Sequence, residues 1–379
     1  MDYASQEEVE VVRSLFQEFR SQLGVTHSQL NADGFVLRTM KGGSSNVNYH
    51  VSVDGQLNFF VKHQSSPVQS RYYSNNLERE YKITNHLSKL GIAPKPLVLT
   101  KNHLISEFIP GVNPKTQDHN FSDTLAEMGQ SIQAFREVPV ALLKELATGT
   151  RFCPKRFFQT MIVPTTHSLA QEILRDGSSH LFQFLEEISG FIQDRLQHEP
   201  KHDCVVDWTE YEEQPRKFPW GLLHNDFALR NILRRTDGNR NLVYVDWEFV
   251  DFGDIAYDLA YLQSENLLLE DQVKVILRHG GLDPYLRDRT LRYTRVFLPM
   301  LELANAYWTL NNISKMLTPS DNKQIKLRPP YTIGQNLEFI RYKIRRLNRI
   351  ARPSSRDEKV LMGEIQFALK LFEAQLVIR

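Results

Sequence analysis

The stretch LLHNDFALRNIL, residues 222–233, places two polar side chains of catalytic type on one short loop. An apolar run precedes Asp226, and Asn231 follows five positions later. Phosphoryl transfer to a hydroxyl needs a carboxylate aimed at the attacking oxygen and a neutral oxygen ligand for magnesium nearby. We therefore predict Asp226 as the catalytic carboxylate and Asn231 as a catalytic and magnesium-binding residue. His224 is interpreted as a brace for the loop, because Asp226 already fills the role of proton acceptor.

Further aspartates follow in VDWEFVDFGDIAYDLAYL, residues 245–262. The preceding LVYV predicts a buried strand that presents Asp246 at its tip, so Asp246 is the predicted metal ligand. The D-F-G tripeptide at Asp251 lies five residues beyond this strand end and is not predicted to bind metal. We interpret Asp251, Asp254 and Asp258 as structural residues, with Asp254 at the start of a helix.

A glycine-rich turn between two predicted strands is a candidate phosphate-binding loop. It consists of Gly42, Gly43, Ser44, Ser45 and Asn46. Glycines let backbone N–H groups approach phosphate oxygens, although such a turn alone is more often only a hairpin turn. Lys62 in the following strand and Glu80 on the next helix strengthen the prediction, because a helical glutamate can hold a lysine against phosphate groups. Glu80 is preferred to Glu78 because it lies beside the apolar stripe of the helix.

The elements that must position these residues form two predicted lobes. Apolar spacing predicts a leading helix over residues 5–23, and Asp54-Gly55 predicts a hairpin turn. The next predicted elements are a helix over 77–90, two short strands, further helices and a small β insert. The further helices include 121–135 and 168–196. Residues 203–219 are predicted to form a polar loop. This order predicts an α+β protein. Residues 1–108 would form an N-terminal nucleotide-binding lobe, and 109–379 a helical C-terminal lobe with the catalytic loop and substrate pocket.

Substrate selection is expected in the helical lobe. Glu248, Glu302 and Trp308 are interpreted as an acidic, aromatic-lined pocket for a cation, with core packing of the aromatic residue as an equally favoured alternative. Arg230 is interpreted either as a phosphate contact or as the partner of a surface carboxylate. These residues do not decide the substrate.

Overall composition bounds the remaining possibilities. A net charge of +1 over 379 residues argues against a general binder of polyanions, and the basic run 339–356 is interpreted as the solvated face of a packed helix. The start of the chain lacks the features of a signal peptide, and no run of eighteen apolar residues occurs, so we expect a cytoplasmic protein without nucleic-acid or membrane partners. Cys153 and Cys204 match no metal-ligand spacing and are expected to be reduced.

Six motifs, taken in order, resemble the aminoglycoside phosphotransferase and choline kinase family, the small-molecule branch of the protein-kinase-like fold. They are GGSSN, FVKH, EREYKITNHL, SEFIPG, HNDFALRN and VDWEFVDFGDIAYDLA, and they span about residues 42–262. The resemblance implies a bilobal fold and transfer of the γ-phosphoryl group of ATP (with GTP as an alternative) to a hydroxyl, with Mg²⁺ as cofactor. It also implies that Lys62 and Glu80 orient the nucleotide phosphates. The adenine edge would bind the backbone of Glu107, Phe108 and Ile109.

The mixture of motifs leaves the acceptor open. HND is similar to choline and ethanolamine kinases, whereas DWE, GD and DLA are closer to the aminoglycoside type. The expected substrate is a small hydroxyl compound such as an aminoglycoside, choline, ethanolamine, another amino alcohol or a sugar, and the expected assembly is a monomer or homodimer. The alternatives are a catalytically silent nucleotide-binding or scaffold protein of the same fold and, with less support because an A-P-E segment is absent, a protein kinase.

Overall fold

The structure is a computed structural model that describes residues 2–31, 34–40, 46–64, 77–146, 207–238 and 241–317, with isolated positions between 152 and 193 and at 342, 343 and 346. The chain divides into two compact units. Unit one comprises 1–147, 221–252 and 268–282, and unit two comprises 148–220, 253–267 and 283–379. The functional boundary expected after residue 108 stays a prediction.

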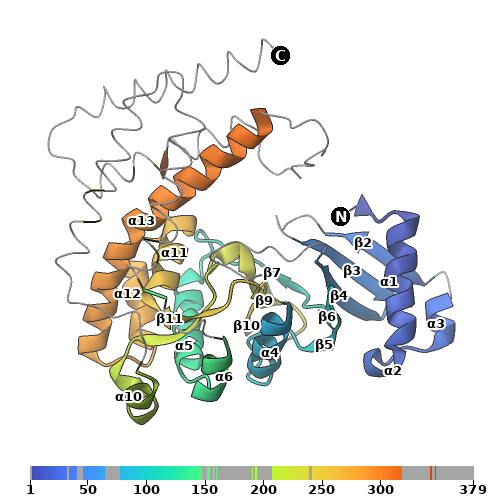
Figure 1. The fold of residues 1–379 in the computed structure, drawn as a ribbon, viewed down its shortest axis with the longest axis horizontal. Coiled ribbons are helices and arrows are strands. Elements are labelled where there is room, and N and C mark those ends of the chain that lie inside the picture. The colour runs from blue at the N-terminus through green and yellow to red at the C-terminus, as the bar shows by residue number, and fades with distance from the viewer. Residues whose placement is uncertain are drawn as a thin grey trace. The chain divides into compact units, whose positions relative to one another are not determined.

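Unit one contains a six-stranded antiparallel sheet (Figure 1). The strands in spatial order are β1 (Asp2–Tyr3), β2 (Phe35–Thr39), β3 (Val47–Val53), β4 (Leu57–His63), β6 (His103–Glu107) and β5 (Pro96–Leu99). Asp54 and Gly55 connect β3 to β4 with φ values of 53° and 68°. Left-handed conformations at both positions are what a tight hairpin turn requires, so the predicted turn is confirmed.

Helices α1 (Gln6–Glu18), α2 (Arg20–Leu23) and α3 (His27–Asn31) pack on this sheet through one apolar cluster. Ser5 and Glu8 form a capping box that begins α1. Phe16 lies at the centre of the contact, with its ring 5.6 Å from that of Phe35 and 5.2 Å from that of Phe59. The helix predicted over 5–23 is present, but it is interrupted at Phe19, and its end at Gly24 in the left-handed conformation is confirmed.

Unit one contains three further helices in its first segment, of which the first two were predicted and the third was not. They are α4 (Leu77–Ser88), α5 (Phe121–Arg136) and α6 (Val140–Leu146). Helix α5 packs against α12 (Glu270–His279), and Gly129 permits the close approach, because a Cβ there would lie 2.4 Å from the backbone oxygen of Ile276.

Short strands, most of whose residues belong to unit one, hold the predicted catalytic stretch. β8 (Trp220–Leu223) is fully buried and pairs with β11 (Asp251–Asp254). The 3₁₀ turn η3 (Leu229–Asn231) leads into β9 (Ile232–Arg235), which lies between β10 (Leu242–Tyr244) and β7 (Gly111–Val112). Gly111 is required at this position, because a Cβ would lie 2.9 Å from the backbone oxygen of Arg234.

Unit two contains α10 (Trp208–Glu213), the 3₁₀ turn η2 (Pro215–Lys217), α11 (Ala256–Asn266) and α13 (Pro284–Leu317), with α11 packed on α13. The prediction of a loop over 203–219 is wrong where α10 forms. Asp207 accepts hydrogen bonds from the N–H groups of Thr209 and Glu210 and so begins the helix. Tyr211 is buried with its ring stacked 5.8 Å from that of Trp220, which a polar composition did not indicate.

Some expectations lie outside the described residues, including most of the helices predicted over 168–196 and 339–356. Cys153 is disulfide-bonded, so the expectation that it is reduced is wrong, since spacing along the chain does not reveal which cysteine the fold brings close. Cys204 lies outside the described residues. Over the described part of the chain, none of the helices combines the length and apolar character needed to cross a membrane.

Candidate active site

A buried lysine surrounded by carboxylates forms the first half of the candidate site. The Lys62 Nζ lies 2.8 Å from both carboxylate oxygens of Glu80, 2.7 Å from Asp246 Oδ1 and 3.8 Å from Glu248 Oε2. Lys62 is 1% exposed and Glu80 4%. The pair predicted between Lys62 and Glu80 is present, and Glu78 instead contacts Lys82 at 3.1 Å. We call Lys62, Glu80, Asp246 and Glu248 the lysine cluster.

The lysine cluster shifts the pKa values of its members in opposite directions. Burial acts to lower the pKa of Lys62, but the charges of Asp246, Glu80 and Glu248 outweigh it and raise that pKa. Burial raises the pKa of Glu80, and it raises the pKa of Glu248 to about 8. Burial opposes ionisation of Asp246, yet the Lys62 ammonium lowers its pKa. The cluster therefore favours the charged forms of Lys62 and Asp246.

The second half of the candidate site is the loop that carries Asp226. Asn231 Nδ2 donates to the Asp226 backbone oxygen at 2.9 Å and to Asp226 Oδ2 at 2.7 Å. These bonds fix the Asp226 carboxylate on its own loop. They also turn the amide nitrogen of Asn231 toward Asp226, so its amide oxygen faces another direction.

Val245 joins the two halves, because both its N–H group and its carbonyl oxygen form hydrogen bonds with the stretch that carries Asp226. Its N–H donates to Asn231 O at 2.9 Å, and its carbonyl oxygen accepts from His224 Nε2 at 2.9 Å. Asp246 is the next residue and contacts Lys62. The structure thus places Asp226, Asn231 and Asp246 beside one another within unit one.

His224 is a structural donor in this arrangement. Its side chain is fully buried, and burial lowers its pKa, so the ring is neutral. Because a carbonyl oxygen only accepts, the bond to Val245 places the proton on Nε2. The predicted bracing contact is present.

Two residues of the site have left-handed backbone conformations that non-glycine residues rarely adopt. Asn225 has φ 62° and Asp246 has φ 66°. Asn225 is held there by its side-chain amide, which donates to Phe249 O at 2.7 Å. Such conformations persist only where the surroundings impose them, and they concentrate at functional sites.

Arg230 is paired with the predicted catalytic carboxylate. Its Nη2 donates to Asp226 Oδ1, and its side chain is 51% exposed against 15% for Asp226. Sequence reasoning left a phosphate contact and a surface carboxylate as alternatives for Arg230. The carboxylate that it contacts is Asp226 itself.

Asn113 is a site residue that the sequence did not reveal. Its Nδ2 lies 3.1, 2.9 and 2.8 Å from the backbone oxygens of Leu229, Arg230 and Ile232. The pairing of Gly111 with Arg235 brings this segment alongside the catalytic loop. No local motif marks Asn113, because its partners are more than 110 positions away.

The structure describes part of the predicted nucleotide-binding set. Gly42, Gly43, Ser44 and Ser45 lie outside the described residues. Asn46 is buried and donates through Nδ2 to Glu248 Oε2.

The segment expected to face the adenine edge follows the end of β6. Glu107 lies at the strand end, 3.6 Å from Arg235 Nη1, and its N–H donates to Lys95 O at 2.9 Å. The Phe108 ring lies 4.3 Å from that of His50, and Ile109 is buried.

The residues expected to bind a cationic substrate have partners within the protein. Glu302 is fully buried in unit two, where Lys343 Nζ lies 3.0 Å and Arg346 Nη1 3.1 Å from its carboxylate oxygens. The cations that Glu302 binds in the structure are therefore the protein's own. Glu248 belongs to the lysine cluster. Trp308 lies in α13, and its side chain is outside the described part of the structure.

Asp251 of the D-F-G tripeptide and Asp254 accept hydrogen bonds from the backbone. Asp251 is buried, accepts from the Phe252 N–H at 2.8 Å and lies 3.8 Å from Arg79. Asp254 ends β11 and accepts from the Ala256 N–H at 3.0 Å, but the N-cap residue of α11 is Ile255, so the helix start predicted at Asp254 lies one position further along the chain. Asp258 is buried in α11.

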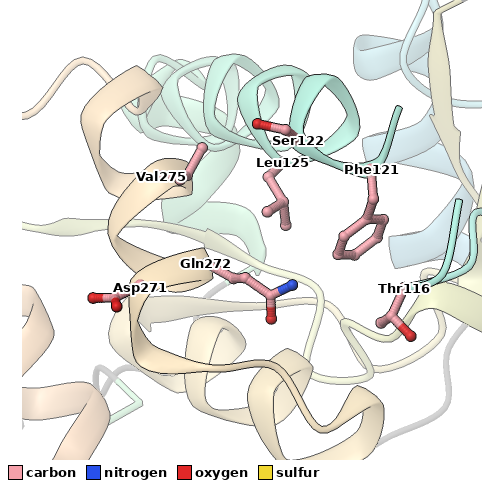
Figure 2. Close-up of a pocket in the computed structure, with 7 residues that line it drawn as sticks. All are labelled: Thr116, Phe121, Ser122, Leu125, Asp271, Gln272 and Val275. Carbon is pink, nitrogen blue, oxygen red and sulfur yellow. The ribbon is translucent and has the colours of Figure 1, made fainter. Parts of the chain in front are cut away.

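A shallow cavity of about 300 Å³ lies elsewhere in unit one, between α5 and α12 (Figure 2). It is lined by Thr116, Phe121, Ser122, Leu125, Asp271, Gln272 and Val275. Phe121, Leu125 and Gln272 point into it, whereas the Asp271 carboxylate points away (Figure 2). The cavity contains none of the catalytic residues described above.

This combination of fold and site matches a known family. The family model described as the phosphotransferase enzyme family matches residues 36–291, about two thirds of the chain. The chain therefore belongs to the phosphotransferase enzyme family, and the resemblance to aminoglycoside phosphotransferases and choline kinases is confirmed.

Solved structures of kinases share the fold of this chain. An ethanolamine kinase of Plasmodium vivax is similar, with a TM-score of 0.61 and 17% identity, over 91% of this chain and 89% of its own. A choline kinase of Cryptosporidium parvum Iowa II has a TM-score of 0.60 and 14% identity, over 97% of this chain and 99% of its own. These similarities confirm the protein-kinase-like α+β fold. Acyl-CoA dehydrogenase family member 11 of Rattus norvegicus is 23% identical over 311 residues, which cover 71% of this chain and 36% of that longer protein.

Proposed function

We propose that the chain transfers the γ-phosphoryl group of ATP to a hydroxyl group of a small molecule. The observation that carries the proposal is the junction at Val245, which places the Asp226 loop beside the lysine cluster. An anchored ammonium suits triphosphate oxygens, and an adjacent carboxylate suits a hydroxyl. The structural neighbours include an ethanolamine kinase and a choline kinase, which supports a small hydroxyl acceptor.

Each proposed role follows from the position of a side chain. Asp226 orients the acceptor hydroxyl and takes up its proton, and Lys62, held by Glu80, contacts the phosphates. Asn46, at the end of the glycine-rich turn, and the backbone of residues 107–109 complete the nucleotide site. Catalysis would come mainly from positioning and charge neutralisation.

The donor set fits magnesium. Mg²⁺ prefers oxygen ligands and is usually bound through one or two carboxylates together with substrate phosphates. Asp246 supplies a carboxylate and Asn231 an amide oxygen. When bound, the ion would neutralise charge on the transferred phosphoryl group.

Asp226→Asn tests the proposal directly. We expect turnover of ATP with an acceptor to fall by about 10²- to 10⁴-fold, because the proton acceptor is lost, while ATP affinity is retained. Asp271→Asn, which changes an exposed carboxylate of α12, is the matched control and should behave as wild type. Asp246→Ala should abolish magnesium-dependent nucleotide binding measured by calorimetry. Near-normal turnover in Asp226→Asn, or wild-type protein that binds no nucleotide, would overturn the proposal.

A further inference from the structure

Arg230 places a positive charge directly at the proposed catalytic carboxylate. Its guanidinium donates to Asp226 Oδ1, and half of its side chain is exposed. Its backbone is held in place, because the Arg230 carbonyl oxygen accepts from Asn113 Nδ2 at 2.9 Å. An acceptor whose hydroxyl reaches Asp226 must therefore also meet a guanidinium.

Three other basic side chains near the catalytic loop form ion pairs with carboxylates other than Asp226. Lys62 is buried among its three carboxylates. Arg234 pairs with Glu127 at 3.0 Å, and Arg235 pairs with Asp237 at 2.5 Å. Arg230 differs from these residues because its partner is the group that must be available to the substrate.

The acidic residues expected to attract a cationic acceptor are also matched by basic partners. Glu248 lies 3.8 Å from Lys62, and Glu302 is paired with Lys343 and Arg346. An ammonium group on the acceptor would have to compete with these cations of the protein. Near Asp226 it would also approach the like charge of Arg230, which is unfavourable.

We propose that the acceptor carries an anionic group, a carboxylate or a phosphate, and that Arg230 binds this group. The inference rests on the proposed function and adds the class of substrate. A guanidinium recognises carboxylate and phosphate oxygens through two parallel hydrogen bonds. The anion of the acceptor therefore competes with Asp226 for Arg230, and a neutral acceptor does not.

The exchange of partners fits the proton balance of the reaction. As Arg230 turns to the anionic group of the acceptor, the Asp226 carboxylate becomes available to the acceptor hydroxyl. The hydroxyl oxygen forms a bond to the γ-phosphorus, the bond from that phosphorus to the β,γ-bridging oxygen breaks, and ADP leaves. The hydroxyl proton passes to Asp226.

Two sets of small acceptors, matched in carbon skeleton and different in charge, test the inference. One set is glycolate, ethylene glycol and ethanolamine, and the other is glycerate, glycerol and serinol, with glycerol phosphate as the phosphate-bearing probe. ADP release with Mg²⁺-ATP is measured for the full chain and for Arg230→Gln, Arg230→Lys and Arg20→Gln. Arg20 is the matched control, because it is an arginine of unit one whose guanidinium donates to a nearby backbone oxygen, that of Gln17, at 3.2 Å.

We expect the anionic acceptors to be the best substrates of the wild-type protein. Arg230→Gln should lower the ratio of kcat/KM for the anionic acceptors to kcat/KM for the neutral acceptors by about 10- to 100-fold, as expected for loss of charged hydrogen bonds to the anion. Arg230→Lys should retain part of the selectivity, because it keeps the charge without the planar fork. Glycerate and glycerol phosphate then decide between a carboxylate and a phosphate.

Three results would overturn the inference. They are faster turnover of the cationic members, an equal loss for all charge classes in Arg230→Gln, and no phosphorylation of any anionic acceptor. An equal loss would assign Arg230 to the transferred phosphoryl group or to the loop. Failure of the proposed function itself looks different, because ATP hydrolysis that depends on Asp226 would then also be absent.

Discussion

Replacing Lys62 by methionine should destabilise the protein more than any other single change in the lysine cluster. Methionine keeps the length and apolar stem of lysine but removes the ammonium from between Glu80, Asp246 and Glu248. Because Lys62 is 1% exposed and Glu80 4%, water cannot replace the lost charge. Removing one partner of a buried ion pair costs about 3–5 kcal/mol, and we expect a loss of unfolding free energy in that range.

Urea denaturation in buffer with a metal chelator measures this loss, and Lys82→Met is the matched control. Lys82 lies on α4 and pairs with Glu78 and Glu145, but its side chain is 42% exposed, so its midpoint should be that of wild type. The double variant Lys62→Met/Glu80→Gln should recover part of the loss, because one uncompensated carboxylate is removed. A midpoint for Lys62→Met equal to that of the control would refute the reasoning, and it would mean that the cluster is hydrated or already protonated.

Three further predictions concern other parts of unit one. Gly129→Ala should lower the free energy of unfolding, measured with urea, by about 1–3 kcal/mol, because the new Cβ would lie 2.4 Å from a backbone oxygen of α12. Gly190→Ala is the control and should not destabilise the protein, because its Cβ would meet no atom within 4 Å. Equal effects of the two variants would contradict the close approach of the helices. Asn113→Ala should lower kcat by about tenfold with little change in the KM for ATP, because three carbonyl oxygens of the Asp226 loop lose their donor. A change in KM alone would contradict a positioning role for Asn113. The His63 and His103 rings are in contact at 2.9 Å, and burial lowers the pKa of His103 to about 4. An unfolded chain therefore binds protons that the folded protein does not. The contribution of His103 to stability should be complete above about pH 6.5 and should fall by about 1 kcal/mol, after allowance for solvent screening, as the pH is lowered toward 4. His103→Gln should flatten this dependence, and an unchanged profile of stability against pH would contradict the prediction.

Local patterns were sufficient for the elements whose signals are local. Three features depend on neighbours within a few positions. They are the Asp54-Gly55 turn, the apolar stripe of α4 beside which Glu80 lies, and the apolar run before Asp226. The choice of Asp246 over Asp251 also used only local signals, a strand tip and a position five residues beyond it, and the metal-binding role of Asp246 stays a prediction. The preference for Glu80 over Glu78 followed from the helical period alone and is confirmed by the contact with Lys62.

Only the tertiary structure decided which charges meet. Lys62 and Asp246 are 184 positions apart and Asn113 and Leu229 are 116 positions apart, so no periodicity in the sequence indicates these contacts. The contact between Glu302 and Lys343 is also remote in sequence. The sequence by itself determined the fold class and the types of side chain available for phosphoryl transfer. Whether each charge is matched by the protein or left for a substrate depends on packing and burial, because electrostatic energy is set by distance and solvent exposure rather than by position along the chain.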